Sequence, residues 1–196
     1  MPKVIRNVCV YCASSQQARP VFYQAAEDLG RTLAKAGTSI TYGGGAVGMM
    51  GTIADAALEA GGEVFGVLPE FMQELEWGHK GLTDLILTAD MHARKTRMIQ
   101  DADAVIALAG GCGTLEELLE AITWKRLALH GKPIVMLNTD GFFDPLAEML
   151  RRSIEEKFMR PEHSAMWTLV DQPADVLPAI QSAPGWDASA RDLATW

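Results

Sequence analysis

The sequence predicts a single α/β domain of the Rossmann-like, doubly wound type, built on a parallel sheet. Short β-branched and apolar runs alternate with longer stretches of helical periodicity, which is the pattern of consecutive βαβ units. The 196 residues suffice for one well-cored domain and are few for two. No internal repeat or linker interrupts the pattern. We therefore expect one nucleotide-binding hydrolase domain over residues 1–181 and an irregular C-terminal tail over residues 182–196.

The expected elements follow one another along the chain in strand–helix order. The expected strands are residues 7–12, 39–42, 63–68, 82–87, 104–108, 133–137 and 168–170. The expected helices are residues 20–36, 48–60, 91–101, 115–130, 143–158 and 173–180. Right-handed crossovers bring the carboxyl ends of parallel strands to one edge of the sheet, so functional residues should gather there.

Composition and charge argue against several classes of protein. Hydrophobic residues make up 48% of the chain and charged residues 21%, which is ordinary for a globular protein. No apolar run approaches the roughly 18–20 residues of a membrane span, and the first residues lack a secretory pattern. We therefore expect a cytoplasmic protein without a membrane partner. The net charge of −8, with no basic block, argues against a nucleic-acid polymer as partner.

The cysteines and histidines do not indicate a metal site or a cofactor. Cys9 and Cys12 form a CxxC inside the apolar run at residues 7–12, where a spacing of three places the two thiols on opposite faces of a strand. We expect buried, unreactive thiols rather than a redox pair. The four histidines are isolated from one another and from the cysteines, so no metal ligand set can be assembled from spacing.

A first glycine turn, residues 43–48, joins an expected strand to an expected helix. Gly43, Gly45 and Gly48 satisfy GxGxxG, in which a backbone without side chains approaches a phosphate at a helix N-terminus. A dinucleotide site would also need an acidic residue at the end of the next strand, and Glu70 is only a loose candidate. Two interpretations stay open: a secondary phosphate site formed by Gly43, Gly44 and Gly45, or a tight turn that needs glycine for packing.

A second glycine turn, residues 110–114, follows the strand at 104–108. It lacks the GK[ST] of a Walker A loop, but it offers bare backbone N–H groups, the Thr114 hydroxyl and the carboxylates of Glu116 and Glu117. In one interpretation, Thr114 caps the helix and Glu117 reaches back to it as a capping box. In the other, the turn binds an anion beside a catalytic carboxylate.

Two helices carry unusual side chains for their positions. Arg94 and Lys95 fall within the apolar stripe of the helix at 91–101, which Asp90 can cap. A buried cation without a partner is costly, so we expect an anion or a carboxylate beside Arg94; a structural ion pair or extension to solvent is the alternative. The helix at 115–130 is apolar nearly all round, which indicates a central helix or a subunit contact.

Together these segments resemble the LOG (LONELY GUY) family, the cytokinin-activating nucleoside 5′-monophosphate phosphoribohydrolases. Residues 42–45, 91–95, 110–117 and 122–124 carry the resemblance, which extends over about residues 8–158 and includes the PGGxGTxxE pattern. Ala109 replaces the proline of that pattern, and Cys112 replaces a residue that is often larger. Both departures bear on substrate preference more than on the class of reaction. Family members are often labelled lysine decarboxylases, but nothing here identifies a pyridoxal-phosphate lysine.

The resemblance implies a reaction, an assembly and a set of residues. It implies hydrolysis of the N-glycosidic bond of adenosine 5′-monophosphate, N6-modified or plain, without metal or organic cofactor, by a homodimer with active sites near the subunit interface. It implies that Arg94 and Glu117 are the catalytic pair. The implied substrate-binding residues are Glu76, Arg94, Lys95, Gly111, Cys112, Gly113, Thr114, Leu115, Glu116, Glu117 and Thr123. Met49, Met50 or Trp77 could line a pocket for the base.

Two rival functions stay open at this level. The same fold could bind a nucleotide without turnover, or the first glycine turn could bind a dinucleotide.

Overall fold

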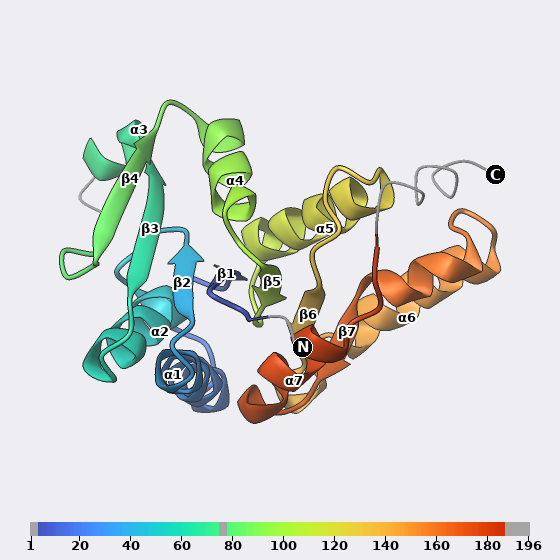
Figure 1. Cartoon of the computed structure of the whole chain (residues 1–196), viewed down its shortest axis with the longest axis horizontal. Coiled ribbons are helices and arrows are strands. Elements are labelled where there is room, and N and C mark those ends of the chain that lie inside the picture. The colour runs from blue at the N-terminus through green and yellow to red at the C-terminus, as the bar shows by residue number, and fades with distance from the viewer. Residues whose placement is uncertain (1–3, 75–77, 187–196) are drawn as a thin grey trace.

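A seven-stranded parallel sheet with helices on both faces forms the frame of the molecule (Figure 1). The computed structural model describes residues 4–74 and 78–186. The strands are β1 (Asn7–Tyr11), β2 (Ser39–Tyr42), β3 (Val64–Pro69), β4 (Asp84–Thr88), β5 (Ala104–Ala107), β6 (Ile134–Leu137) and β7 (Thr168–Val170). Their order in the sheet is β4-β3-β2-β1-β5-β6-β7. The Rossmann-like, doubly wound fold is confirmed, and each expected strand is present with small shifts at its ends.

The helices also follow the expected order, with two differences. They are α1 (Pro20–Lys35), α2 (Gly48–Glu59), α3 (Glu70–Glu74), α4 (Met91–Gln100), α5 (Cys112–Arg126), α6 (Asp144–Glu155) and α7 (Val176–Ser182), with 3-10 turns at Thr139–Gly141, Pro161–Met166 and Pro173–Asp175. The short helix α3 was not expected. Helix α5 begins at Cys112 rather than Leu115, which changes the interpretation of the second glycine turn.

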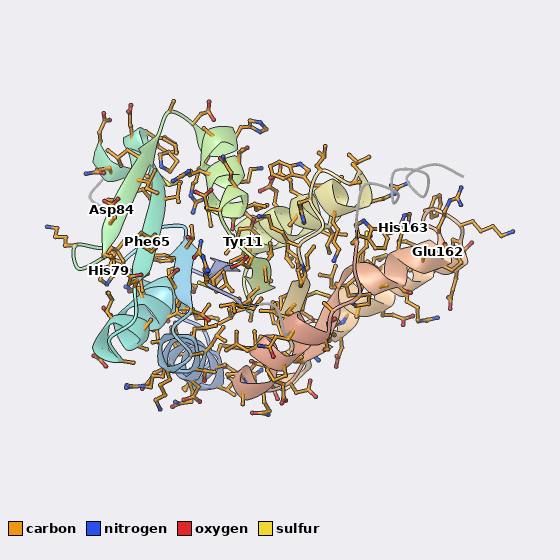
Figure 2. The ribbon with its side chains drawn as sticks, viewed as in Figure 1. Tyr11, Phe65, His79, Asp84, Glu162 and His163 are labelled. Carbon is orange, nitrogen blue, oxygen red and sulfur yellow. The ribbon has the colours of Figure 1, made fainter. Side chains whose placement is uncertain are left out.

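The core consists of two apolar layers, one on each face of the sheet. Helices α1, α2 and α7 cover the face that receives Val8 and Val10 of β1, and helices α4, α5 and α6 cover the face that receives Cys9 and Tyr11. Figure 2 shows Tyr11 near the middle of the molecule, where only 1% of it is exposed. This alternation follows from the two-residue period of a strand whose two faces are both buried.

The two cysteines of the CxxC lie in different layers, as their spacing predicts. Cys9 is fully buried on the α5 side, and Cys12 is buried on the α1 side. Burial raises the pKa of Cys9 to about 12 and also raises that of Cys12. Both are therefore neutral thiols held apart by the strand, and the redox interpretation is excluded.

The strand order places a switch point between β1 and β5. From β1 the chain adds β2, β3 and β4 on one side, and then returns to add β5, β6 and β7 on the other. Val8 pairs with Ile40 of β2 and with Ala104 of β5, so the carboxyl ends of the central strands lie next to one another. Crevices at such points are the usual ligand sites of open α/β sheets.

The end of the described chain is tied to α5. Helix α7 extends through Ser182, the first residue of the expected tail. Four residues later the indole Nε1 of Trp186 donates a hydrogen bond of 2.7 Å to the carbonyl of Lys125. In the described residues, no helix is long and apolar enough to cross a membrane.

Candidate active site

A cavity of about 640 Å³ opens at the carboxyl ends of β1, β2, β3 and β5. It lies where the strand order predicts a ligand site, and both glycine turns contribute to its wall. The lining residues come from the loops after these strands and from α2, α3, α4 and α5: Cys12, Ala13, Ser14, Ser15, Gly43, Gly45, Ala46, Val47, Met50, Leu68, Met72, Met91, Arg94, Gly111, Gly113, Thr114, Glu116 and Glu117.

Arg94 is buried beside this cavity and is held at three points. Its Nε donates to the carbonyl of Val67 in β3 at 3.0 Å, and its Nη2 donates to the carbonyl of Gly43 after β2 at 3.2 Å. Its Nη1 donates to Oε1 of Glu117 at 3.0 Å, and the two side chains are only 8% and 10% exposed. A buried Arg94 was expected to have an anionic partner, and that partner is Glu117.

The capping-box interpretation of Glu117 is wrong. Helix α5 begins at Cys112, with Gly111 in extended backbone conformation as its N-cap. The first helical bond runs from the Leu115 N–H to the Gly111 carbonyl at 3.0 Å. Thr114 is thus the third residue of the helix and cannot cap it, and the Glu117 carboxylate points to Arg94 instead. Sequence reasoning favoured threonine over glycine as the cap, which placed the start of the helix too late.

Burial and charge act in opposite directions on Glu117. Burial raises the pKa of Glu117 above its usual range, and the guanidinium of Arg94 is the main opposing influence. The site therefore holds a desolvated carboxylate whose raised pKa is partly offset by one paired guanidinium. Such a group can accept a proton or stabilise a developing positive charge within the cavity.

Two positions of the second glycine turn, Gly111 and Gly113, face open space, whereas a Cβ on Gly110 would overlap the side chain of Thr114. A side chain added at Gly111 or Gly113 would meet no atom within 4 Å, so packing does not require glycine at either position. The N–H groups of the first residues of a helix have no intrahelical acceptor, and the helix dipole favours negative charge there. The turn thus has room and donors for a phosphate, with Thr114 buried beside it.

The first glycine turn, by contrast, is filled. A Cβ on Gly43 would overlap Nη2 of Arg94. Gly48 has φ +64°, and a Cβ there would overlap the main chain at Ser14. The N–H of Met50 donates to the carbonyl of Ala13 at 3.2 Å rather than facing a ligand. Packing therefore explains Gly43 and Gly48, and the GxGxxG match loses its value as a dinucleotide signal.

The remaining residues implied by the resemblance are dispersed. Lys95 Nζ lies 2.5 Å from Glu116 Oε1 and 3.1 Å from Glu120 Oε2, so it bridges α4 to α5. In the described part of the chain, Lys95 and Thr123 do not line the cavity. Thr123 is exposed and donates to the carbonyl of Leu119 at 2.7 Å. Cys112 is exposed and Leu115 half-buried, whereas Glu76 lies outside the described residues.

Several lining residues were missed in the sequence. Ser14 and Ser15 follow β1, and the rule that ligands bind at strand carboxyl ends could have found them. Met72 and Met91 have no such signal, because α3 was not expected and Met91 appeared to be a core residue. Of the methionines proposed for the base, Met50 lines the cavity, but Met49 is 1% exposed and belongs to the core.

Trp77, the third residue suggested for the base pocket, lies outside the described residues.

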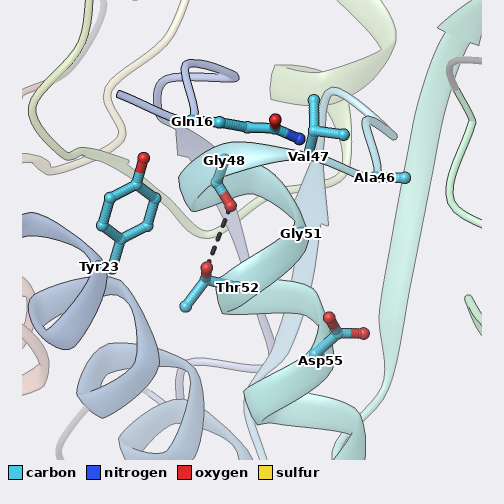
Figure 3. A pocket seen from close by; sticks show the side chains of 8 residues that line it. All are labelled: Gln16, Tyr23, Ala46, Val47, Gly48, Gly51, Thr52 and Asp55. Carbon is cyan, nitrogen blue, oxygen red and sulfur yellow. Dashed lines mark hydrogen bonds between the residues drawn. The ribbon is translucent and has the colours of Figure 1, made fainter. Parts of the chain in front are cut away.

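A second, shallower hollow of about 320 Å³ lies beside the cavity (Figure 3). It shares Ala46 and Val47 with the cavity and lies over the first turns of α2, where Thr52 Oγ1 donates to the Gly48 carbonyl at 3.0 Å. Asp55 is the one charged side chain of its described lining, and its carboxylate lies 2.9 Å from His79 Nε2. A negative hollow of this kind does not suit a phosphate.

The fold and the cavity define an α/β protein that pairs an open glycine turn with a buried guanidinium and carboxylate. The family model described as "Possible lysine decarboxylase" matches residues 50–180. The cytokinin riboside 5′-monophosphate phosphoribohydrolase LOG3 of Arabidopsis thaliana is 41% identical over 156 residues, covering 80% of this chain and 73% of the relative. The probable cytokinin riboside 5′-monophosphate phosphoribohydrolase LOGL2 of Oryza sativa subsp. japonica is 38% identical, covering 90% and 72%.

The chain therefore belongs to the family that contains the LOG phosphoribohydrolases. The X-ray structure of the protein TM1055 shares the fold, with a TM-score of 0.71 and 27% sequence identity over 90% of this chain and 98% of that one.

Proposed function

We propose that this protein hydrolyses the N-glycosidic bond of a nucleoside 5′-monophosphate and releases the free base and ribose 5-phosphate. One observation carries the proposal: the open glycine turn and the Arg94–Glu117 pair face the same cavity. The names of the relatives agree with this reaction. The family model's decarboxylase description gains no support from the cavity, whose described lining contains no lysine.

The second glycine turn binds the 5′-phosphate in this proposal. The backbone N–H groups at the start of α5 and the Thr114 hydroxyl are the donors, and the empty space over Gly111 and Gly113 admits the phosphate oxygens. Binding energy from this remote group fixes the sugar beside the reacting groups. A nucleoside without its phosphate should therefore be a poor substrate.

Glu117 acts on the sugar. Breaking the N-glycosidic bond builds positive charge on the ribose, as in other glycoside hydrolyses. A carboxylate beside the anomeric carbon stabilises that charge and takes a proton from the attacking water. Arg94 keeps Glu117 ionised against the cost of burial and orients it. Three of the five guanidinium N–H groups bond to described atoms, which leaves two for the substrate.

The apolar part of the cavity receives the base. Met50, Leu68, Met72 and Met91 lie on this part of the wall. Methionine side chains are flexible and adapt to different shapes. We therefore propose adenosine 5′-monophosphate and its N6-substituted forms as substrates.

The exposed face of α5 supports a homodimer. Leu119 and Leu127 are 40% and 45% exposed on this face, and Thr123 lies between them. Apolar side chains grouped in this way mark interaction surfaces. A second copy packed on this face would cover Thr123, which is exposed in the single chain. A monomer mass by light scattering at micromolar concentration would contradict this.

We also propose a cytoplasmic location and no metal requirement. Cys9, Cys12 and Cys112 are all free thiols, and Cys112 is exposed, which suits a reducing compartment. Within the described residues, no three His, Cys, Asp or Glu side chains group as metal ligands.

The deciding experiment is a panel of purine nucleoside monophosphates with chromatographic identification of the product. We expect free base and ribose 5-phosphate from adenosine 5′-monophosphate or an N6-substituted form, and much slower release from adenosine. Nucleotide binding without base release at high enzyme concentration would favour the non-catalytic module. An NAD titration run in parallel tests the dinucleotide alternative.

A further inference from the structure

We propose that Gly43 is a positioning residue of the active site, which seats the Arg94 guanidinium through its main-chain carbonyl and through the space that its missing side chain leaves. This inference rests on the proposed function, in which Arg94 and Glu117 act on the sugar. In this inference, the first glycine turn holds an arginine side chain rather than a phosphate.

The guanidinium is located by the ends of two neighbouring strands. Gly43 directly follows the last residue of β2, and its carbonyl accepts from Arg94 Nη2 at 3.2 Å. Val67 in β3 accepts from Nε at 3.0 Å. These two main-chain acceptors fix the plane of the guanidinium, and its remaining edge then reaches Glu117 Oε1 at 3.0 Å. A planar donor fork held in this way has little freedom to rotate.

The space beside Gly43 is already occupied. A Cβ at this position would lie closer to Nη2 of Arg94 than the 3.0 Å below which real Cβ atoms essentially never lie. It would also meet Cε of Met50 at 2.5 Å, but a methionine can move at low cost. The Arg94 side chain is 8% exposed and bonded at three points, so it can yield only by breaking those bonds.

The neighbouring glycines do not share this role. Gly44 has φ +75°, which explains its identity by backbone conformation alone. A Cβ at Gly45 would meet only the side chain of Met50, at 3.0 Å and beyond. Within the first glycine turn, Gly43 is thus the position where an added side chain would collide with Arg94. The space on the Cβ side of Gly43 is taken by the guanidinium and is not open to a phosphate.

The test is a double-mutant cycle of Gly43→Ala and Arg94→Ala. We expect Gly43→Ala to lower kcat by about 100-fold, the size of effect that follows when a catalytic group is displaced. KM should stay within about threefold, because the phosphate turn is untouched. In the Arg94→Ala background, the same change should alter kcat less than about twofold, because its target is already gone.

Melting temperatures provide a second cycle that does not depend on activity. Gly43→Ala should lower the melting temperature by roughly 3–5 °C in the parent and by much less in Arg94→Ala. Gly62→Ala is the matched control: its Cβ would lie 2.7 Å from that of Ala34, at the opposite end of the strands. That variant should lose stability with kcat unchanged.

The outcomes separate the two proposals. The role of Gly43 would be overturned if the two substitutions acted independently. In that case the double variant would show the product of the two single losses in kcat and the sum of the two single losses in melting temperature. A Gly43→Ala protein that folds only when Arg94 is also replaced would support it. If the parent releases no base, the proposed function fails, and the stability cycle still decides whether Gly43 seats Arg94.

Discussion

The two glycine turns line one cavity and use glycine for opposite reasons. In the first turn, Gly43 is needed because an arginine already fills the space beside it. In the second, Gly111 and Gly113 have nothing beside them, although Gly110 is packed against Thr114. Glycine patterns in a sequence do not distinguish a filled turn from an open one. The difference appears only when the atoms that a side chain would meet are known, and it supports the proposal that the open turn binds the ligand.

The strongest test of this comparison removes the carboxylate of Glu117. The first glycine turn helps to position this group by holding Arg94. Glu117→Gln keeps the shape and a hydrogen-bond acceptor for Arg94, but it removes the base, so kcat should fall by about 100-fold or more. Because the amide oxygen still accepts from Arg94 and burial already disfavours the charge on Glu117, we expect the melting temperature to stay within about 5 °C. Parental turnover in this variant would move the chemistry away from Glu117.

A milder test fills the open turn. Gly113→Ala adds a methyl group where no protein atom lies within 4 Å, and it replaces a helical glycine, so the free energy of unfolding should stay equal or rise by up to about 1 kcal/mol. Affinity for a nucleoside monophosphate should nevertheless fall by about tenfold, because the methyl group occupies phosphate space. Calorimetry gives both quantities on one protein. A destabilised variant with unchanged affinity would show that the turn is structural.

The smallest expected effect concerns the pH dependence of kcat. On the acidic side, the loss of activity should occur at a higher pH than for an ordinary glutamate. Burial raises the pKa of Glu117, and a base must be ionised, so activity should fall with decreasing pH through a pKa above the ordinary value of about 4.3 for glutamate. The other charges that act on Glu117 are Arg94, Lys95, Glu116 and Glu120. A loss of activity at or below the ordinary value would mean that Arg94 outweighs burial.

The raised pKa of Glu117 also affects how the stability of the folded protein depends on pH. The dependence is opposite to that of a surface carboxylate in a salt bridge, whose pKa is lowered. Because the folded pKa of Glu117 is raised, the folded protein binds this proton more readily than the unfolded chain. The contribution of Glu117 to stability is therefore greatest below the ordinary pKa and is lost as the pH rises through the raised one.

Much of the frame could be predicted because its signals are local and repeated. Strands such as β5 and β6 are unbroken apolar runs, and their alternation with amphipathic helices indicates a parallel sheet. The partner of Arg94 was also predictable in kind, because a cation in an apolar stripe demands an anion. Its identity did not follow from the local pattern, since Glu117 is 23 residues away and could equally have been a capping residue. Only the resemblance to the LOG family paired Arg94 with Glu117.

The failures at the site have a common physical origin. The start of α5, the position of Met49 and the contribution of Ser14 depend on how loops from different strands meet, which sequence periodicity does not encode. A shift of three residues at the start of α5 changed Thr114 from an expected cap into a side chain on the cavity wall. Chemistry-bearing residues were thus easier to identify than their surroundings.

The seating of Arg94 on two main-chain carbonyls determines which mutations can retune this site. A substitution at Val67 leaves its oxygen acceptor in place, because every amino acid carries the same carbonyl, whereas any side chain at Gly43 would overlap the guanidinium. Of the three acceptors that the structure describes for Arg94, only Glu117 can be exchanged by a codon change. A laboratory selection for altered chemistry would therefore find its useful variation at Glu117 and at the lining methionines Met50, Met72 and Met91, while Arg94 is retained.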